Sequence, residues 1–259
     1  MGIPLHRVSC LKCATNLAEG QEAPTFQLEL NDTQTFERDC PNGHKVTIVI
    51  QNLKHELLFE IAMRALCNGD TRGAVFNAAS ALESFYMFFI AVAFRSLNLQ
   101  ADPAQLRSAW LHRSEQQAGG FAVAYSLLFG DAPPAAIIGR AKFRNDVVHA
   151  GLVPTQEQAD QYVEAVYDVI VPLVDRLRAL DDDKLDEEVA KQGVRARRAA
   201  LVVSPLMTLL GTVICCNVIH TPSHSFAQAR REFETITMKR LQANQLVHLS
   251  QLLLGREPD

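Results

Sequence analysis

The chain lacks three patterns that mark common protein classes. It has no glycine-rich loop of the kind that cradles phosphate, no nucleophile elbow, and no internal repeat. It also lacks an excess of positive charge, because 25 basic and 29 acidic residues give a formal net charge of -4. These absences argue against a P-loop nucleotidase, an α/β-hydrolase, a repeat protein and a generally basic nucleic-acid coat. Any RNA site must therefore be local.

Signals for export and membrane insertion are weak. Residues Met1–Leu5 show no charged stretch followed by a long apolar run, which favours a soluble, cytoplasmic protein. Leu201–Ile219 has about the length of a membrane span and follows Arg195, Arg197 and Arg198. Polar residues and a proline interrupt this segment, and its β-branched residues suit buried strands. We therefore expect no membrane span.

Two pairs of metal-binding residue types lie near the N-terminus. Cys10 and Cys13 are separated by two residues, and Cys40 and His44 by three, with a turn-forming Pro-Asn-Gly between the second pair. This spacing is typical of a structural zinc site, in which four protein ligands leave no position for water. His6 is a spare ligand nearby. The alternative is that these are ordinary reduced cysteines.

A β-hairpin ribbon is expected around these ligands. Residues Thr25–Leu30 and Lys45–Ile50 alternate as strands, and Asn31-Asp32 supplies a turn. So small a unit has little apolar area for a core, so bound metal would supply much of its folding free energy. Its few basic residues make a weak case for nucleic-acid binding by the ribbon alone.

Residues 52–180 show helical patterning almost throughout. An apolar helix is predicted over Thr71–Leu97, with the acid Glu83 on it, and another over Ala135–Val148. Gly151 and Pro154 would stop the second of these. The next helix begins at a capping box that joins residues 155 and 158, which are Thr and Gln.

A short polar motif stands at that predicted helix end. It places a permanent cation, an amide and an imidazole within six residues, as Arg144, Asn145 and His149. These groups could hold a phosphate and move a proton near neutral pH. The alternative is structural: Arg144 pairs with a carboxylate, Asn145 caps the turn and His149 satisfies exposed carbonyls.

This layout resembles the HEPN superfamily, all-helical domains that often act as ribonucleases. The signature of that family is an arginine, a polar residue, three variable residues and a histidine, and Arg144, Asn145 and His149 match it in order and spacing. Gly151 and the Pro154-Thr155 pair also look like many family members. The resemblance covers about half of the chain and implies an all-helical bundle over that part.

The resemblance further implies metal-independent RNA cleavage by a homodimer whose two motifs meet across a shared cleft. His149 would then be the general acid or base, Arg144 the clamp on phosphoryl charge, and Asn145 an orienting group. Glu83 is a further candidate, as the partner that an active-site arginine would need. Two alternatives remain: a non-catalytic scaffold that binds nucleotides, RNA or proteins, and a toxin-like subunit silenced by a separate protein partner.

The composition changes after Leu180. Asp181-Asp182-Asp183 is expected to open a solvated helix that runs from acidic to basic. One or two strands between Leu206 and Ile219 and a helix from about Phe226 would follow, with His220 and His224 in a loop. Cys67 and the Cys215-Cys216 pair are expected to be buried as small hydrophobic residues.

The sequence therefore predicts a mainly α protein in three parts. These are a zinc ribbon over residues 1–51, a HEPN-like helical domain over residues 52–180, and a small α/β extension over residues 181–259.

Overall fold

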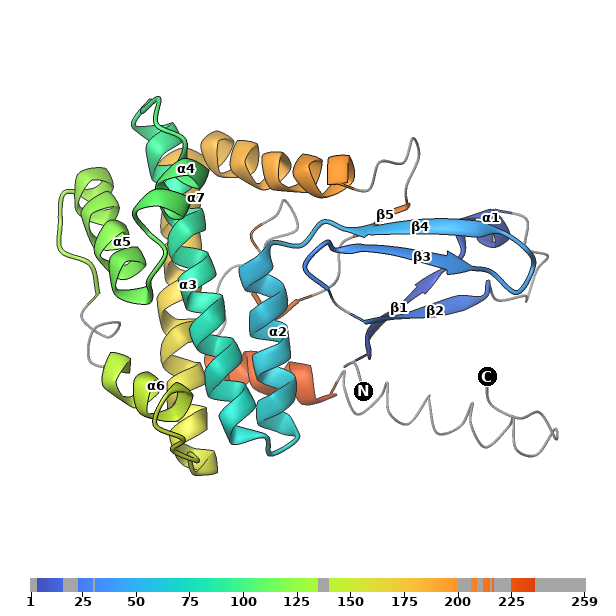
Figure 1. Cartoon of the computed structure of the whole chain (residues 1–259), viewed down its shortest axis with the longest axis horizontal. Helices are drawn as coiled ribbons and strands as arrows, with labels where there is room; N and C mark the ends of the chain where they lie inside the picture. The colour runs from blue at the N-terminus through green and yellow to red at the C-terminus, as the bar shows by residue number, and fades with distance from the viewer. Residues whose placement is uncertain are drawn as a thin grey trace.

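The computed structural model describes residues 4–15, 23–29, 31–134, 140–199, 206–208, 212–214, 216 and 225–235. It is mainly helical, with the β ribbon at one end of a helical bundle (Figure 1). The predicted class, a mainly α fold with an N-terminal hairpin, is confirmed at this level.

The ribbon contains two antiparallel strand pairs. Strand β1 (Pro4–Ser9) pairs with β2 (Thr25–Glu29), and β3 (Thr35–Asp39) pairs with β4 (Lys45–Ile50). The sequence patterns had indicated β2 and β4, but not β1, β3 or the short helix α1 (Leu11–Ala14). Residue Leu30, the last of the predicted strand, lies outside the described residues. The ribbon therefore has more strands than the alternation of the sequence reveals.

A strand from the C-terminal part of the chain completes the second sheet. Strand β5 (Leu206–Thr208) pairs in parallel with β4, and Ile48 lies opposite Leu206. The apolar positions of β4 are buried with Phe26 and Phe36, and Leu57 from the first long helix joins the same cluster. The ribbon is thus attached to the bundle through one helix and through a strand far away in sequence.

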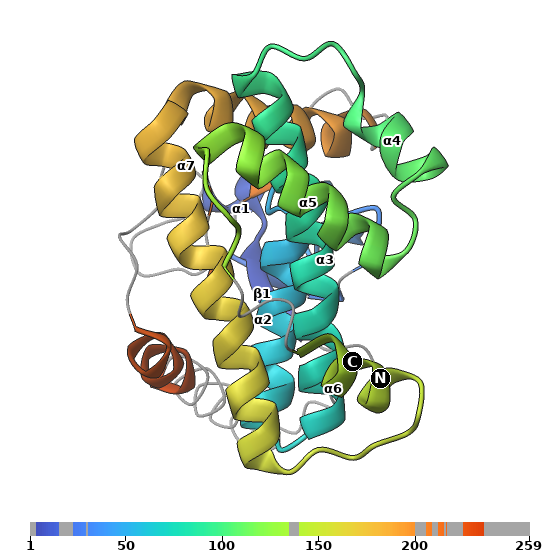
Figure 2. The ribbon, with the colours of Figure 1, turned by 90° about the vertical axis from the view of Figure 1, so that its left-hand side faces the viewer.

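Helix α3 (Thr71–Ser96) lies at the centre of the bundle and confirms the predicted apolar helix almost to the residue. Its first turn is capped by Asp70, whose side chain accepts a hydrogen bond from the backbone N–H of Gly73 at 2.9 Å. It packs against α2 (Lys54–Cys67), α5 (Ser114–Phe129), α6 (Ala141–Val148) and α7 (Gln156–Ala199), as Figure 2 shows. A short helix, α4 (Pro103–Ala109), lies between α3 and α5.

Helix α3 is also the one described helix long and apolar enough to cross a membrane, and 61% of its most apolar window is buried. Its aromatic residues explain that burial. Phe85 and Phe89 are fully buried. In α5, Phe121 meets Phe89 edge to face and Tyr125 stacks on it, with ring centroids 4.9 and 6.1 Å apart. The apolar surface of α3 therefore forms the core of the bundle.

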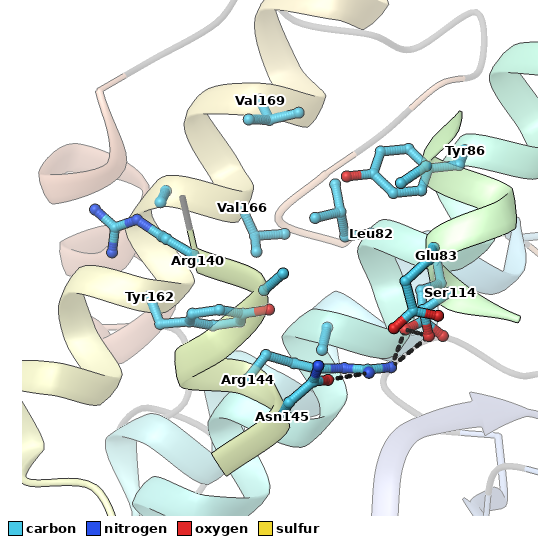
Figure 3. Close-up of a pocket in the computed structure, with 15 residues that line it drawn as sticks. Leu82, Glu83, Tyr86, Ser114, Arg140, Arg144, Asn145, Tyr162, Val166 and Val169 are labelled. Carbon is cyan, nitrogen blue, oxygen red and sulfur yellow. Dashed lines mark hydrogen bonds and ion pairs between the residues drawn. The ribbon is translucent and has the colours of Figure 1, made fainter. Parts of the chain in front are cut away.

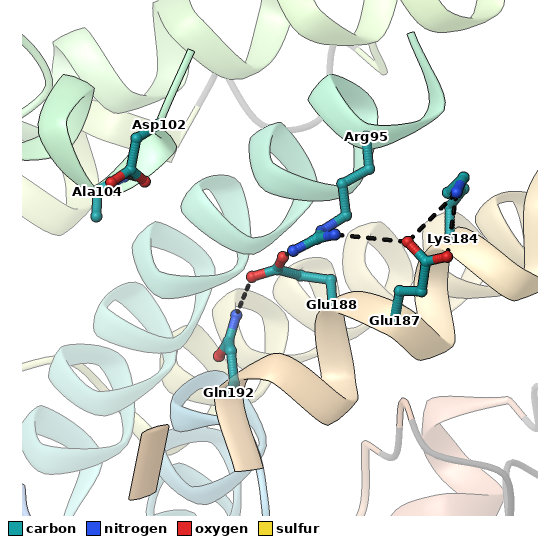
Figure 4. Close-up of polar contacts among 7 residues, drawn as sticks. All are labelled: Arg95, Asp102, Ala104, Lys184, Glu187, Glu188 and Gln192. Atoms are coloured by element: carbon teal, nitrogen blue, oxygen red, sulfur yellow. Dashed lines mark hydrogen bonds and ion pairs between the residues drawn. The ribbon is translucent and has the colours of Figure 1, made fainter. Parts of the chain in front are cut away.

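Helix α7 changes direction at Asp181. The backbone there is extended, with φ −161° and ψ 81°, and the Asp181 side chain accepts a hydrogen bond from the backbone N–H of Lys184 at 3.1 Å. A new helical segment thus opens at Asp181, as predicted. It is held on α3 by an ion pair between Arg95 and the buried Glu188 at 2.7 Å (Figure 4).

The described residues that follow β5 contribute to the core of the bundle. Residues 226–235 are helical, which confirms the predicted helix, and the rings of Phe226 and Tyr167 lie 5.6 Å apart. Ile214 and Cys216 are buried in the same cluster as the helices. Of the predicted strand region, β5 is observed. Residues 209–211, Cys215 and residues 217–224, with His220 and His224, lie outside the described residues.

Candidate functional site

A cavity of about 270 Å³ lies among α3, α5, α6 and α7. Most of its wall is apolar, as Figure 3 shows for Leu82, Val166 and Val169, while polar groups gather at one end. Three of the four predicted site residues, Glu83, Arg144 and Asn145, line this polar end. The fold therefore brings together residues that are 61 positions apart in sequence.

Arg144 is the centre of the polar group. Its guanidinium donates hydrogen bonds to Asn145 Oδ1 and to Ser114 Oγ, each at 2.7 Å, and forms an ion pair with Glu83 (Figure 3). Glu83 does pair with the arginine of the motif, as its position on an apolar helix had suggested. This arrangement neutralises the charge of Arg144 and holds its planar fork in one orientation.

Ser114 is a site residue that sequence reasoning missed. Its hydroxyl donates to Glu83 Oε1 at 2.7 Å while accepting from Arg144, so it bridges the ion pair. It lies in the first turn of α5, where serine is common for structural reasons. No local pattern distinguishes this serine from an ordinary helix start, so only the fold reveals it.

Two tyrosines border the cavity. Burial raises the pKa of Tyr162 to about 12, an effect that Arg144 partly offsets and Glu83 adds to. Burial also raises the pKa of Tyr86, with smaller contributions from Tyr162 and Glu83. Both phenols therefore keep their protons at neutral pH and are available as hydrogen-bond donors rather than bases.

His149 lies apart from this group. It is exposed at the C-terminal cap of α6 and does not line the cavity. Helix geometry explains the separation, because five residues of α-helix turn the side-chain direction by about 500°, which leaves about 140° between Arg144 and His149. Within one chain, the motif therefore presents the arginine inward and the histidine to solvent.

Local structure fixes the end of α6. Val147 is fully buried and anchors the helix, and Gly151 follows with φ +77°, the left-handed conformation predicted for a helix stop. The next helix begins at the predicted capping box: the backbone N–H of Gln158 donates to Thr155 Oγ1, and that of Thr155 donates to Gln158 Oε1. The corner that carries His149 is thus defined on both sides.

Gly151→Ala should lower the free energy of unfolding by about 1–2 kcal/mol, because a side chain disfavours the left-handed conformation. Gly119→Ala is the matched control, since Gly119 is exposed within α5 and has open space around the position of a Cβ. It should raise stability by about 0.5–1 kcal/mol. Urea unfolding measures both changes, and an equal effect at the two positions would contradict the proposed role of Gly151.

The second candidate site is a cluster of Cys10, Cys13, Cys40 and His44 in the ribbon. The three cysteines are buried, and the four ligand atoms lie within 4.8 Å of one another. The Sγ atoms of Cys13 and Cys40 are 3.4 Å apart, and Cys13 Sγ lies 3.3 Å from His44 Nδ1. Ligands of a tetrahedral zinc ion are about 3.5–3.8 Å apart, given bond lengths of about 2.0–2.3 Å. The cluster is compatible with a bound metal ion.

Neighbouring groups donate hydrogen bonds to the sulfur atoms. The side chain of Asn42 donates to Cys13 Sγ at 3.3 Å, and its backbone N–H donates to Cys40 Sγ at 3.5 Å. Burial raises the pKa of the Cys10 thiol, but bonds from the Cys13 backbone and His44 outweigh this and bring the pKa to about 7. At Cys10 these contacts favour thiolate, the form that binds metal, whereas burial raises the pKa of the Cys13 thiol. His6, the spare ligand, has its side chain outside the described part of the chain.

Comparison of this chain with protein-family models, with curated proteins and with solved structures finds no match.

Proposed function

We propose that this protein is a metal-independent endoribonuclease of the HEPN type, in which the ribbon is held together by structural zinc. The observation that supports this most strongly is the placement of Arg144, Asn145 and Glu83 at the polar end of one cavity, with His149 exposed on the adjoining helix end. The resemblance supplies the chemistry, in which the ribose 2′-hydroxyl attacks the adjacent phosphorus.

Arg144 retains the capacity to bind phosphate. Its described hydrogen bonds use both N–H groups of Nη2 and one of Nη1. Within the described part of the chain, the Nε–H and the second Nη1–H have no acceptor. Each of these two N–H groups can donate one charge-assisted hydrogen bond to a phosphoryl oxygen. Glu83 and Ser114 would keep the fork oriented toward the substrate, and Asn145 would orient an oxygen.

His149 would act as the general acid or base from a position open to solvent. Because Arg144 and His149 of one chain diverge, a site that needs both is better formed by two chains, as the resemblance to a dimeric family implies. Two exposed apolar residues next to His149, Leu152 and Val153, are 40% and 71% exposed and would suit such an interface. The active form is then a homodimer with two composite sites.

The proposed setting is the cytoplasm, in defence or toxin biology, which again rests on the resemblance. A second function is favoured by one observation: Arg144 is already paired with Glu83 in the free chain. A neutralised arginine beside an apolar cavity suits a non-catalytic module that binds a nucleotide, RNA or protein, with the ribbon recruiting a further partner.

The direct test is incubation of the purified protein with a pool of cellular RNA, with and without a chelator. Cleavage that continues during brief exposure to the chelator, and that leaves 2′,3′-cyclic phosphate and 5′-hydroxyl ends, is the expected result. Binding of the RNA pool without cleavage, in the presence or absence of the chelator, would favour the scaffold instead. Products with 5′-phosphate ends would contradict attack by the 2′-hydroxyl.

A further inference from the structure

A second group of metal-binding side chains lies where the C-terminal segment meets the start of α2. His55 and Glu56, from the first turn of α2, meet Cys216, and all three are buried. His55 Nε2 lies 3.3 Å from Cys216 Sγ, and one ligand atom of each residue lies within 4.8 Å of the others. The cluster joins positions 161 apart in sequence and shares no residue with the ribbon cluster.

The donor set suits a divalent transition metal. Imidazole nitrogen, thiolate sulfur and carboxylate oxygen are the three ligand types of zinc in proteins. The separation of His55 and Cys216 is close to the value of about 3.5 Å expected between nitrogen and sulfur ligands of a tetrahedral zinc ion. It is also close to the Cys13–His44 separation of 3.3 Å in the ribbon.

The surrounding contacts orient these ligands. Glu56 Oε1 accepts from the backbone N–H of Cys216 at 2.6 Å, and Oε2 accepts from Asn52 Nδ2 and from the Leu53 N–H, each at 3.0 Å. A ligating carboxylate is commonly held by such hydrogen bonds. The ring of His55 packs against Phe85 and Phe88, with centroids 5.3 and 5.1 Å away. The side chains of His55 and Glu56 are thus held in place by the protein alone.

The cluster borders a cavity through which an ion and water could reach it. A cavity of about 520 Å³ between the ribbon, α2, α3, α4 and α7 has Asn52 and His55 in its wall. Three protein ligands leave one coordination position for a water molecule.

We propose that His55, Glu56 and Cys216 form a second zinc-binding site, which ties Cys216 to the start of α2. Binding releases the thiol proton of Cys216 to solvent and forms a sulfur–zinc bond. The ion would replace the direct contact between the thiol and the imidazole. This site is independent of the ribonuclease proposal, because none of its residues lies in the cavity of Arg144.

The test compares the metal content of the full chain with that of two site variants and one control variant, all purified from zinc-containing medium. We expect two zinc ions per chain in the wild type and one in Cys216→Ser. His55→Gln should give the same loss by removing the nitrogen ligand. Cys67→Ser is the matched control, because Cys67 is half-buried and belongs to neither cluster. Its zinc content should equal that of the wild type.

Cobalt substitution provides a second measurement that does not depend on counting metal. Four thiolates, from Cys10, Cys13, Cys40 and Cys216, should contribute to the thiolate-to-cobalt charge-transfer band. Cys216→Ser should therefore lower that band by about a quarter, with an unchanged helical circular dichroism spectrum. The proposal would be overturned by one zinc per wild-type chain, or by two zinc ions in Cys216→Ser with an unchanged cobalt band. The contact between Cys216 and His55 would then be an ordinary thiol–imidazole hydrogen bond.

Discussion

We expect His149→Ala to abolish RNA cleavage, with a loss of at least about 100-fold to 10,000-fold in rate, which is the usual contribution of a general acid or base. The same change should leave the free energy of unfolding within about 0.5 kcal/mol of the wild type. The reason is the position of the residue: His149 is exposed at the end of α6, and its described contact is through its backbone N–H, which alanine retains. Single-turnover cleavage and urea unfolding measure the two effects.

His112→Ala is the control for this variant. His112 is also exposed and does not line the cavity of Arg144, so its loss should change neither cleavage nor stability. Mixing His149→Ala chains with Arg144→Ala chains adds a test of the shared site, because a mixed dimer would contain one intact pair. Partial recovery of cleavage in the mixture is expected. A large loss of stability in His149→Ala, with cleavage intact, would instead assign His149 a structural role.

Local patterns in the sequence were sufficient for the long helices and for the ribbon ligands. Helix α3 was predicted from its long apolar helical pattern, and the structure adds that Asp70 caps its start. The start of α7 was predicted because the Thr155 and Gln158 hydrogen bonds depend only on neighbours in sequence. The cysteine spacing likewise reports a local loop geometry, which the fold confirms as a cluster.

Contacts between distant segments could not be read in this way. The parallel pairing of β5 with β4 joins residues about 160 positions apart, and a three-residue strand has no distinctive alternation. Cys216 was expected to be buried, and it is, but its contact with His55 is set by the fold. Cys67, expected to be buried, is half-buried. Ser114 was missed for the same reason: its role exists only once α3, α5 and α6 are packed together.

The candidate site was predictable in composition but not in arrangement. The motif identified Arg144, Asn145 and His149, and the apolar setting of Glu83 suggested that it needs a partner. That partner is Arg144, and their ion pair makes Glu83 part of the same site. The periodicity of the α-helix already implies that Arg144 and His149 diverge, but whether they meet across two chains depends on an assembly that one sequence does not specify.

Removing metal from the ribbon should unfold it while leaving most of the bundle helical. Cys13→Ser is the sharpest variant, because Cys13 Sγ lies within 3.4 Å of Cys40 Sγ, His44 Nδ1 and Asn42 Nδ2. The buried cluster of the ribbon is small and separate from that of the bundle, so little apolar burial remains to hold its strands. Structural zinc contributes about 10–16 kcal/mol in isolated zinc-finger peptides, far more than such a core supplies.

Hydrogen exchange of the backbone amides in β3 and β4 measures this effect. In Cys13→Ser, or after prolonged chelation, these amides should exchange at rates close to those of an unfolded chain, whereas the amides of α3 stay protected. Amides of the first turns of α2 should show intermediate rates, because Leu57 packs into the ribbon cluster. Cys67→Ser should leave every rate unchanged. Protection of β3 and β4 in Cys13→Ser equal to that of the wild type would mean that the ribbon folds without metal, and would rule out a structural zinc ion there.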